Sequence, residues 1–160
     1  MAKARMLNRS IATDKKLNRM SPYADWIYIR TIPFLDRDGI INGDPEELAA
    51  TVCPWRLAMI VDEMPAIIDE WVNSGLVIRY QSGQFTALYF CGFGKNQRIE
   101  YDKEAPSKFN PPPGTKRTKK GLIECDSGEN DNGYSASTRR VLLDQSPSTR
   151  PLSISINKDQ

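Results

Sequence analysis

Four carboxylates near the middle of the chain have a spacing that could bind calcium. They stand at relative positions one, three, nine and twelve of an EF-hand loop: Asp36, Asp38, Asp44 and Glu47. Such a loop needs glycine at position six and an oxygen ligand at position five, where this chain has Ile41 and Ile40. The same carboxylates are better explained by a turn at Asp36 and a helix cap at Asp44. The sequence therefore predicts no metal site here.

The complete absence of histidine excludes more chemistry than any other feature of the composition. No Ser-His-Asp triad, Cys-His pair or His-containing zinc site can be formed. The cysteines match no CxxC spacing, and their odd count favours a reducing compartment: Cys53, Cys91 and Cys125. We expect Cys53 and Cys91 to be small core residues. With no nucleophile beside a visible base, the chain is predicted not to be an enzyme, with no catalytic residue and no cofactor.

Three tryptophans could stack on nucleic-acid bases. Trp26 and Trp71 fall on apolar faces of predicted helices, which favours packing in a core. Trp55 adjoins Arg56 in a segment, residues 53–61, whose pattern fits either a helix or a packed loop. A surface contact and a packed position both remain open for Trp55.

The net charge of +2 conceals a strong segregation of charge along the chain. Residues 1–20 carry six basic side chains and one acidic one, and residues 76–120 carry nine basic and three acidic ones. Between them, residues 21–75 carry three basic and ten acidic side chains. This arrangement can direct a polyanion to the two basic segments, while the acidic part repels it or receives a basic partner.

The elements that would position these residues begin with three helix signals. Ser21-Pro22 starts a first helix, which Pro33 should kink or shorten near its end. Asp44-Pro45 starts a second helix, where Glu47 should complete a capping box. A third helix is predicted for residues 62–74 from apolar residues at helical spacing: Met64, Ile67, Ile68, Trp71 and Val72.

Strand signals lie on either side of the second and third helices. Residues 40–42 could form one short strand, and residues 76–81 and 84–90 read as a β-hairpin joined by Ser82-Gly83. This order predicts an α+β fold, a winged helix-turn-helix with three helices and a β-hairpin wing. We divide the chain into a basic N-terminal arm (residues 1–20), a winged-helix domain (21–110) and a Pro-rich exit with a disordered tail (111–160). No membrane span or secretory signal is apparent, which favours a cytoplasmic protein.

Two helices followed by a hairpin make double-stranded DNA the first partner to consider. The third helix is acidic, so its face is expected to repel phosphates and to bind a protein instead: Glu63, Asp69 and Glu70. DNA contacts are therefore predicted on the wing, the segment behind it, the arm and the irregular segment: Arg79, Gln81, Gln84, Lys95, Gln97, Arg98, Lys3, Arg5, Arg9 and Arg56.

Several short motifs follow the order seen in phage replication proteins with an N-terminal winged helix. The first of them are Lys3-Ala4-Arg5-Met6-Leu7-Asn8, Asp14-Lys15-Lys16-Leu17-Asn18, Arg30-Thr31-Ile32-Pro33-Phe34-Leu35-Asp36 and Gly43-Asp44-Pro45. The later ones are Trp71-Val72-Asn73-Ser74-Gly75, Phe93-Gly94-Lys95-Asn96-Gln97 and Ala105-Pro106-Ser107-Lys108-Phe109. Over residues 3–113 the chain resembles replisome organisers. It departs from them at Asn96, where a histidine is common, and in its short tail.

The resemblance implies binding of origin DNA through this domain and recruitment of a replicative helicase or its loader by a C-terminal part. Further copies of the chain are additional candidate partners. Two other functions stay open at this point. One is a winged-helix transcriptional regulator that binds a palindrome as a dimer. The other is a protein-docking module that uses the acidic helical face.

Overall fold

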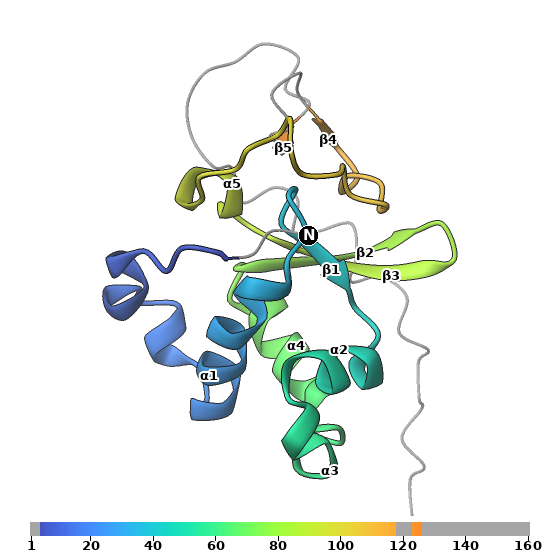
Figure 1. The fold of residues 1–160 in the computed structure, drawn as a ribbon. Helices are drawn as coiled ribbons and strands as arrows, with labels where there is room; N and C mark the ends of the chain where they lie inside the picture. Colours follow the sequence, from blue (N-terminus) through green and yellow to red (C-terminus); the bar gives the residue numbers. More distant parts are fainter. Residues whose placement is uncertain (1–3, 118–122, 126–160) are drawn as a thin grey trace, which may run out of the picture. The chain divides into compact units, whose positions relative to one another are not determined.

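Helices packed on a three-stranded antiparallel sheet form the folded part of the chain (Figure 1). The computed structural model describes residues 4–117 and 123–125, which fall within the unit Met1–Asp126. Lys3 and the tail after Cys125 lie outside the described residues. The predicted α+β class is confirmed.

The helical elements alternate with short 3₁₀ turns. The α-helices are α1 (Pro22–Thr31), α2 (Pro45–Val52), α3 (Leu57–Ile60), α4 (Met64–Asn73) and α5 (Phe93–Asn96). The 3₁₀ turns are η1 (Arg9–Thr13), η2 (Leu17–Arg19), η3 (Ile32–Phe34) and η4 (Pro54–Arg56). In the segment that sequence left open, residues 53–61, the structure has the two short helical elements η4 and α3, which cover residues 54–60. As the position of Pro33 predicts, α1 ends at Thr31 and continues only as the 3₁₀ turn η3.

Side-chain caps begin α1 and α2, as predicted. The Ser21 hydroxyl accepts a hydrogen bond from the Ala24 amide, and the Asp44 carboxylate accepts one from the Glu47 amide at 2.9 Å. The reciprocal half of the predicted capping box is absent, because the Glu47 carboxylate accepts from the side-chain amide of Asn42. Asn42 in turn accepts from the Asp44 amide at 3.1 Å, so the last residue of β1 supplies the missing part of the cap.

The main sheet has the order β1–β3–β2, with β1 (Ile40–Asn42) and β2 (Val77–Ser82) both antiparallel to β3 (Phe85–Phe90). Ser82 pairs with Phe85, so the hairpin loop is Gly83-Gln84, one residue later than predicted. Gly83 has a φ of 65°, and a glycine at the first loop position suits the turns that close two-residue hairpins. A small second hairpin joins β4 (Thr115–Arg117) to β5 (Ile123–Cys125).

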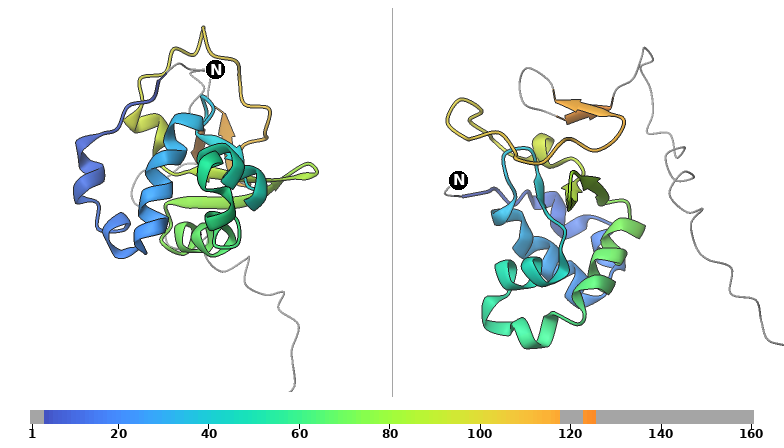
Figure 2. Two further views of the ribbon diagram at one scale, coloured as in Figure 1. Left: turned by 60° about the horizontal axis from the view of Figure 1, so that its bottom comes forward. Right: turned by 90° about the vertical axis from the view of Figure 1, so that its right-hand side faces the viewer.

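One face of the main sheet packs on α1, α2 and α4 to form the larger core (Figures 1 and 2). Its centre is an aromatic cluster in which Tyr28 and Phe90 both lie against Trp71, with ring centroids 5.8 and 5.7 Å away. The Trp71 indole donates to the Ala24 carbonyl at 2.9 Å. Trp71 is therefore a core residue as predicted, and Cys53 is also buried, whereas Cys91 is only half-buried.

The opposite face of the main sheet is covered by the chain that follows the hairpin. Phe109 packs with Ile40, Tyr80 and Ala87 in a second, smaller core. The Tyr80 hydroxyl donates to the Asn110 carbonyl at 2.6 Å, and the Asn110 amide donates to the Ser82 hydroxyl at 2.8 Å. The predicted domain end at residue 110 therefore falls inside the described unit, which continues through β4. Among the described residues, no helix has the length and apolar character needed to cross a bilayer.

Candidate nucleic-acid interface

Helix α4 buries one face and leaves the other open to solvent. The buried face enters the larger core through Met64, Ile67, Ile68 and Trp71. The open face carries Ala66, Asp69 and Asn73, which lie three to four residues apart and therefore line one side of the helix. Of the acidic side chains that the sequence assigned to a protein partner, Asp69 lies on this face, Glu63 is the exposed N-cap residue of α4, and Glu70 is half-buried.

Arg79 of β2 borders one side of the open face. Its guanidinium forms an ion pair with Asp69 at 2.8 Å, and the two side chains are 46% and 55% exposed. An exposed pair of this kind adds about 0–1 kcal/mol to stability, so its main effect is to hold Arg79 along α4. The sequence placed Arg79 and Asp69 on separate surfaces for DNA and for protein, whereas the structure places them in contact.

Three cations of the arm border the other side of α4: Lys15, Lys16 and Arg19. Together with Met20 they line an open hollow of about 430 Å³, whose α4 side is Glu70, Asn73 and Ser74. Lys16 donates to the Gly75 carbonyl at 3.4 Å, which ties this part of the arm to the end of α4. Glu70 accepts from the Ser21 amide at 2.8 Å, so its carboxylate is already engaged at the start of α1. These three cations are not among the residues predicted from the sequence to bind DNA, although the basic composition of residues 1–20 was a signal for them.

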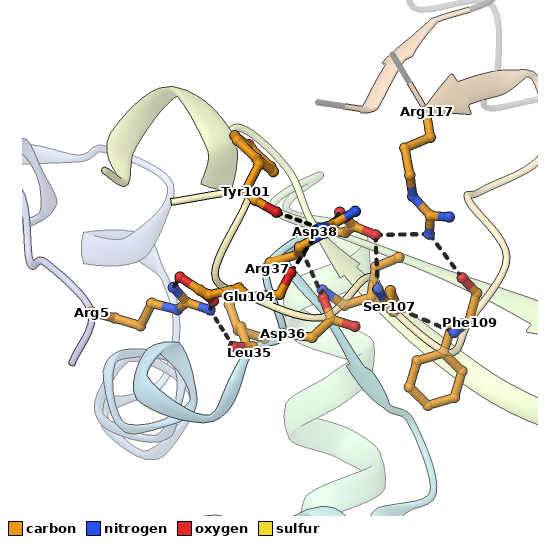
Figure 3. A network of polar contacts seen from close by, with 11 residues as sticks. Arg5, Leu35, Asp36, Arg37, Asp38, Tyr101, Glu104, Ser107, Phe109 and Arg117 are labelled. Atoms are coloured by element: carbon orange, nitrogen blue, oxygen red, sulfur yellow. Dashed lines mark hydrogen bonds and ion pairs between the residues drawn. The ribbon is translucent and has the colours of Figure 1, made fainter. Parts of the chain in front are cut away.

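The arm is held to the rest of the unit by two of the residues predicted to bind DNA. Arg5 donates to both carboxylate oxygens of Glu104, at 3.0 and 2.7 Å, and to the Leu35 carbonyl, and its side chain is only 3% exposed (Figure 3). Gln97 accepts from the Met6 amide at 2.9 Å and donates to the Met6 carbonyl at 2.7 Å. Both side chains anchor the arm, which leaves Arg5 with almost no surface to offer a ligand.

A buried ionic cluster holds the C-terminal part of the unit to the turn before β1 (Figure 3). Asp36 accepts from the amides of Asp38 and Ile40, both at 2.9 Å, which confirms the predicted turn. The fully buried carboxylate of Asp38 pairs with Arg117 at 2.7 Å and accepts from the Ser107 amide at 3.2 Å. Burial raises the pKa of the Asp36 carboxyl above its usual range. These carboxylates therefore stabilise the fold. Their spacing in the sequence could not reveal the partners Ser107 and Arg117, which lie about 70 or more positions further along the chain.

The remaining predicted DNA-binding residues are spread over several surfaces. Arg9 is exposed in η1, and Lys95 and Arg98 are exposed in and after α5. Arg56 lies over the partly buried ring of Trp26, 5.2 Å from its centroid. The hairpin tip carries Gln84, and Gln81 donates to the Thr86 hydroxyl at 3.2 Å. Arg79 is the single charged residue of residues 77–90, so the hairpin is less basic than the segment totals indicated.

Acidification should loosen the arm. The Arg5 guanidinium holds the pKa of the Glu104 carboxyl below its usual range. The ion pair therefore contributes fully above the pKa of Glu104 in the unfolded chain, and its contribution is lost as the pH falls through the lower, folded value. Below about pH 4 we expect faster amide exchange in residues 4–8, after correction for intrinsic rates.

Glu104→Gln should remove this acid-dependent step, because the side chain can no longer titrate. Glu100→Gln is the matched control, since Glu100 forms an exposed ion pair with Lys103 and does not touch the arm. An acid-dependent step that persists in Glu104→Gln would assign the release of the arm to another group.

The chemistry available at α4 is therefore electrostatic recognition. A helix face with compensated acids lies between Arg79 and the cations Lys15, Lys16 and Arg19, a pattern suited to a polyanion. Within the described part of the chain, no group of three or more Cys, Asp or Glu side chains could hold a metal ion.

Comparison of the chain with protein-family models, curated proteins and solved structures found no match.

Proposed function

We propose that this protein binds double-stranded DNA through a winged-helix domain and acts in the initiation of phage-type DNA replication. The observation that carries the DNA-binding proposal is the position of α4 between two sets of cations, Arg79 on one side and the arm residues Lys15, Lys16 and Arg19 on the other. A helix with basic side chains on both flanks can face a groove while the flanks meet phosphates.

The winged-helix assignment rests on element order and strand pairing. The order α1, β1, α2, α4, β2, β3 and the pairing of β1 with β3 support it. In this assignment α4 is the helix that faces DNA and the β2–β3 hairpin is the wing. The insertion of η4 and α3 between α2 and α4, and the cover that Phe109 provides on the outer face of the sheet, are additions to this plan.

The acidic residues of α4 are compatible with this interface because their charges are partly compensated. Asp69 is paired with Arg79, and Glu70 accepts from the Ser21 amide beside three cations. Phosphates would compete with Asp69 for Arg79, so the free energy gained from a phosphate contact is reduced by the cost of separating that ion pair. Asp69 therefore weakens the contribution of Arg79 to DNA affinity.

Asp69→Asn should leave duplex affinity unchanged or raise it slightly, because it releases Arg79 and removes a repulsive charge. Arg79→Ala should weaken binding by about 1 kcal/mol and reduce the slope of log affinity against log salt by about 0.9. Fluorescence anisotropy with a labelled duplex at several salt concentrations measures both effects. Should Asp69→Asn abolish sequence preference instead, Asp69 reads a base directly, as a carboxylate can at cytosine.

The replication role is supported by the ordered motifs that resemble replisome organisers. Footprinting over the DNA that surrounds the gene for this protein tests it. Protection of a set of sites at an origin, with recovery of a helicase or loader on the bound DNA, is the expected result. Protection confined to a promoter palindrome would favour a transcriptional regulator. Absence of all duplex binding at low salt would favour a protein-docking module and would refute the DNA-binding proposal.

A further inference from the structure

An exposed aromatic and apolar patch lies on the short helical segment between α2 and α4. The side chain of Trp55 is 98% exposed, and Met59, four residues further along the chain, is also exposed. Trp55 belongs to the 3₁₀ turn η4 and Met59 to the four-residue helix α3, and Arg56 between them has non-helical backbone angles (φ −129°, ψ 19°). In Figures 1 and 2, α3 lies at the end of the helical layer away from the main sheet. The described residues therefore leave the Trp55 indole open to solvent.

Two arginines lie beside this patch and share the ring of Trp26. The guanidinium carbons of Arg30 and Arg56 lie 4.9 and 5.2 Å from the Trp26 centroid. Arg30 donates through Nε to the Val52 carbonyl at 3.1 Å, which fixes its position at the end of α2. None of the ion pairs among the described residues includes either arginine. Arginines stacked in this way keep in-plane N–H groups that can donate to an anion.

We propose that the Trp55 patch, defined as Trp55, Arg30 and Arg56, binds single-stranded nucleic acid. An unpaired base would stack on Trp55, and the flanking phosphates would bind the two arginines. This combination of a solvent-exposed aromatic ring with adjacent cations is the one that single-strand binders use. Bases inside a duplex present no free face to Trp55, so the patch discriminates against intact double-stranded DNA. The proposal uses none of the residues of the α4 interface and stands independently of it.

The ligand must supply both flat apolar faces and negative charge. A wholly apolar protein surface would leave Arg30 and Arg56 buried without an acceptor, at a cost in free energy. An acidic peptide would meet the charge requirement, and it is therefore included as a competing ligand in the test. Single-stranded nucleic acid meets both requirements with every nucleotide.

Tryptophan fluorescence of the full chain, titrated with oligo(dT) at low salt, tests the proposal. Trp71 is buried and Trp26 is partly buried under two arginines, so quenching by a stacked base should come mainly from Trp55. We expect saturable quenching in the native chain. In Trp55→Ala the reporting indole is gone, so the affinity is read from the fluorescence anisotropy of labelled oligo(dT), and we expect about ten-fold weaker binding. Binding of duplex DNA should change by less than about two-fold in the same variant.

Three further variants keep the test specific. Trp55→Phe should retain most of the affinity because a smaller ring still stacks, and Arg56→Gln should reduce the salt dependence of oligo(dT) binding. Tyr23→Ala, which removes another exposed aromatic side chain, should change nothing. Thermal unfolding of each variant confirms that the fold is intact. Equal oligo(dT) affinity in Trp55→Ala and the native chain, or quenching by an acidic peptide but not by oligo(dT), would overturn the proposal.

Discussion

Replacement of Lys15, Lys16 and Arg19 by glutamine should weaken binding of duplex DNA about 100-fold at low salt. Each cation that meets a phosphate contributes about 1 kcal/mol, and three of them together correspond to about two orders of magnitude in affinity. The slope of log affinity against log salt should become shallower by about 2.7, because fewer counterions are released. Fluorescence anisotropy with a labelled duplex over a range of salt concentrations gives both quantities.

The matched control removes charge elsewhere on the described surface. Lys103→Gln and Lys108→Gln alter exposed lysines that follow α5 and do not line the α4 interface. This pair should change the affinity by less than about two-fold if binding is localised at α4. Equal losses per charge in both sets would mean that DNA responds only to the total charge of the protein. The proposed site between the arm and β2 would then be wrong.

Asp38→Asn should destabilise the fold by about 3 kcal/mol, because it breaks a buried ion pair and leaves the charges of its arginine partners uncompensated. The Asp38 carboxylate is fully buried, pairs with Arg117 at 2.7 Å and lies 3.6 Å from the Nε of Arg37. Arg117 remains partly exposed, which places the expected loss at the lower end of the range for buried pairs. Urea-induced unfolding followed by circular dichroism measures the change.

Hydrogen exchange shows which part of the molecule Asp38 holds. The amides of Ser107 and Phe109 should lose protection in Asp38→Asn before those of α4, because Asp38 fastens the segment that covers the outer face of the sheet. Asp102→Asn is the matched control, since that carboxylate is exposed and its removal should cost less than about 0.5 kcal/mol. An unchanged free energy of unfolding in Asp38→Asn would show that the packing of Phe109, and not the ionic cluster, holds this segment on the sheet.

Local signals in the sequence were sufficient to predict the types and order of the main elements. Ser21-Pro22 and Asp44-Pro45 start helices because their side chains satisfy first-turn amides a few residues away. The short strand before α2 and the hairpin after α4 were also predicted, the hairpin with a loop one residue too early. The predicted hydrogen bond from the Asp44 amide to the Glu47 carboxylate does not form, because the Glu47 carboxylate accepts from the Asn42 side chain of β1 instead.

The role of each charged side chain was decided by packing between distant segments. Arg5 meets Glu104 across 99 positions, and Arg117 meets Asp38 in the same unit in which Phe109 covers the sheet. In the charge totals of the basic segments, Arg5, Arg79 and Arg117 are equivalent cations. In the structure, each of them pairs with a carboxylate from another part of the chain. Local propensity acts over a few residues, whereas such pairs form only when tertiary packing brings elements together and removes water between them. The sequence by itself therefore determined α1, α2, α4, the strands of the main sheet and the absence of histidine chemistry. Tertiary structure decided which charges remain exposed beside α4, and the sequence did not predict α5 or the strands β4 and β5, which lie in the segment assigned to the exit and tail.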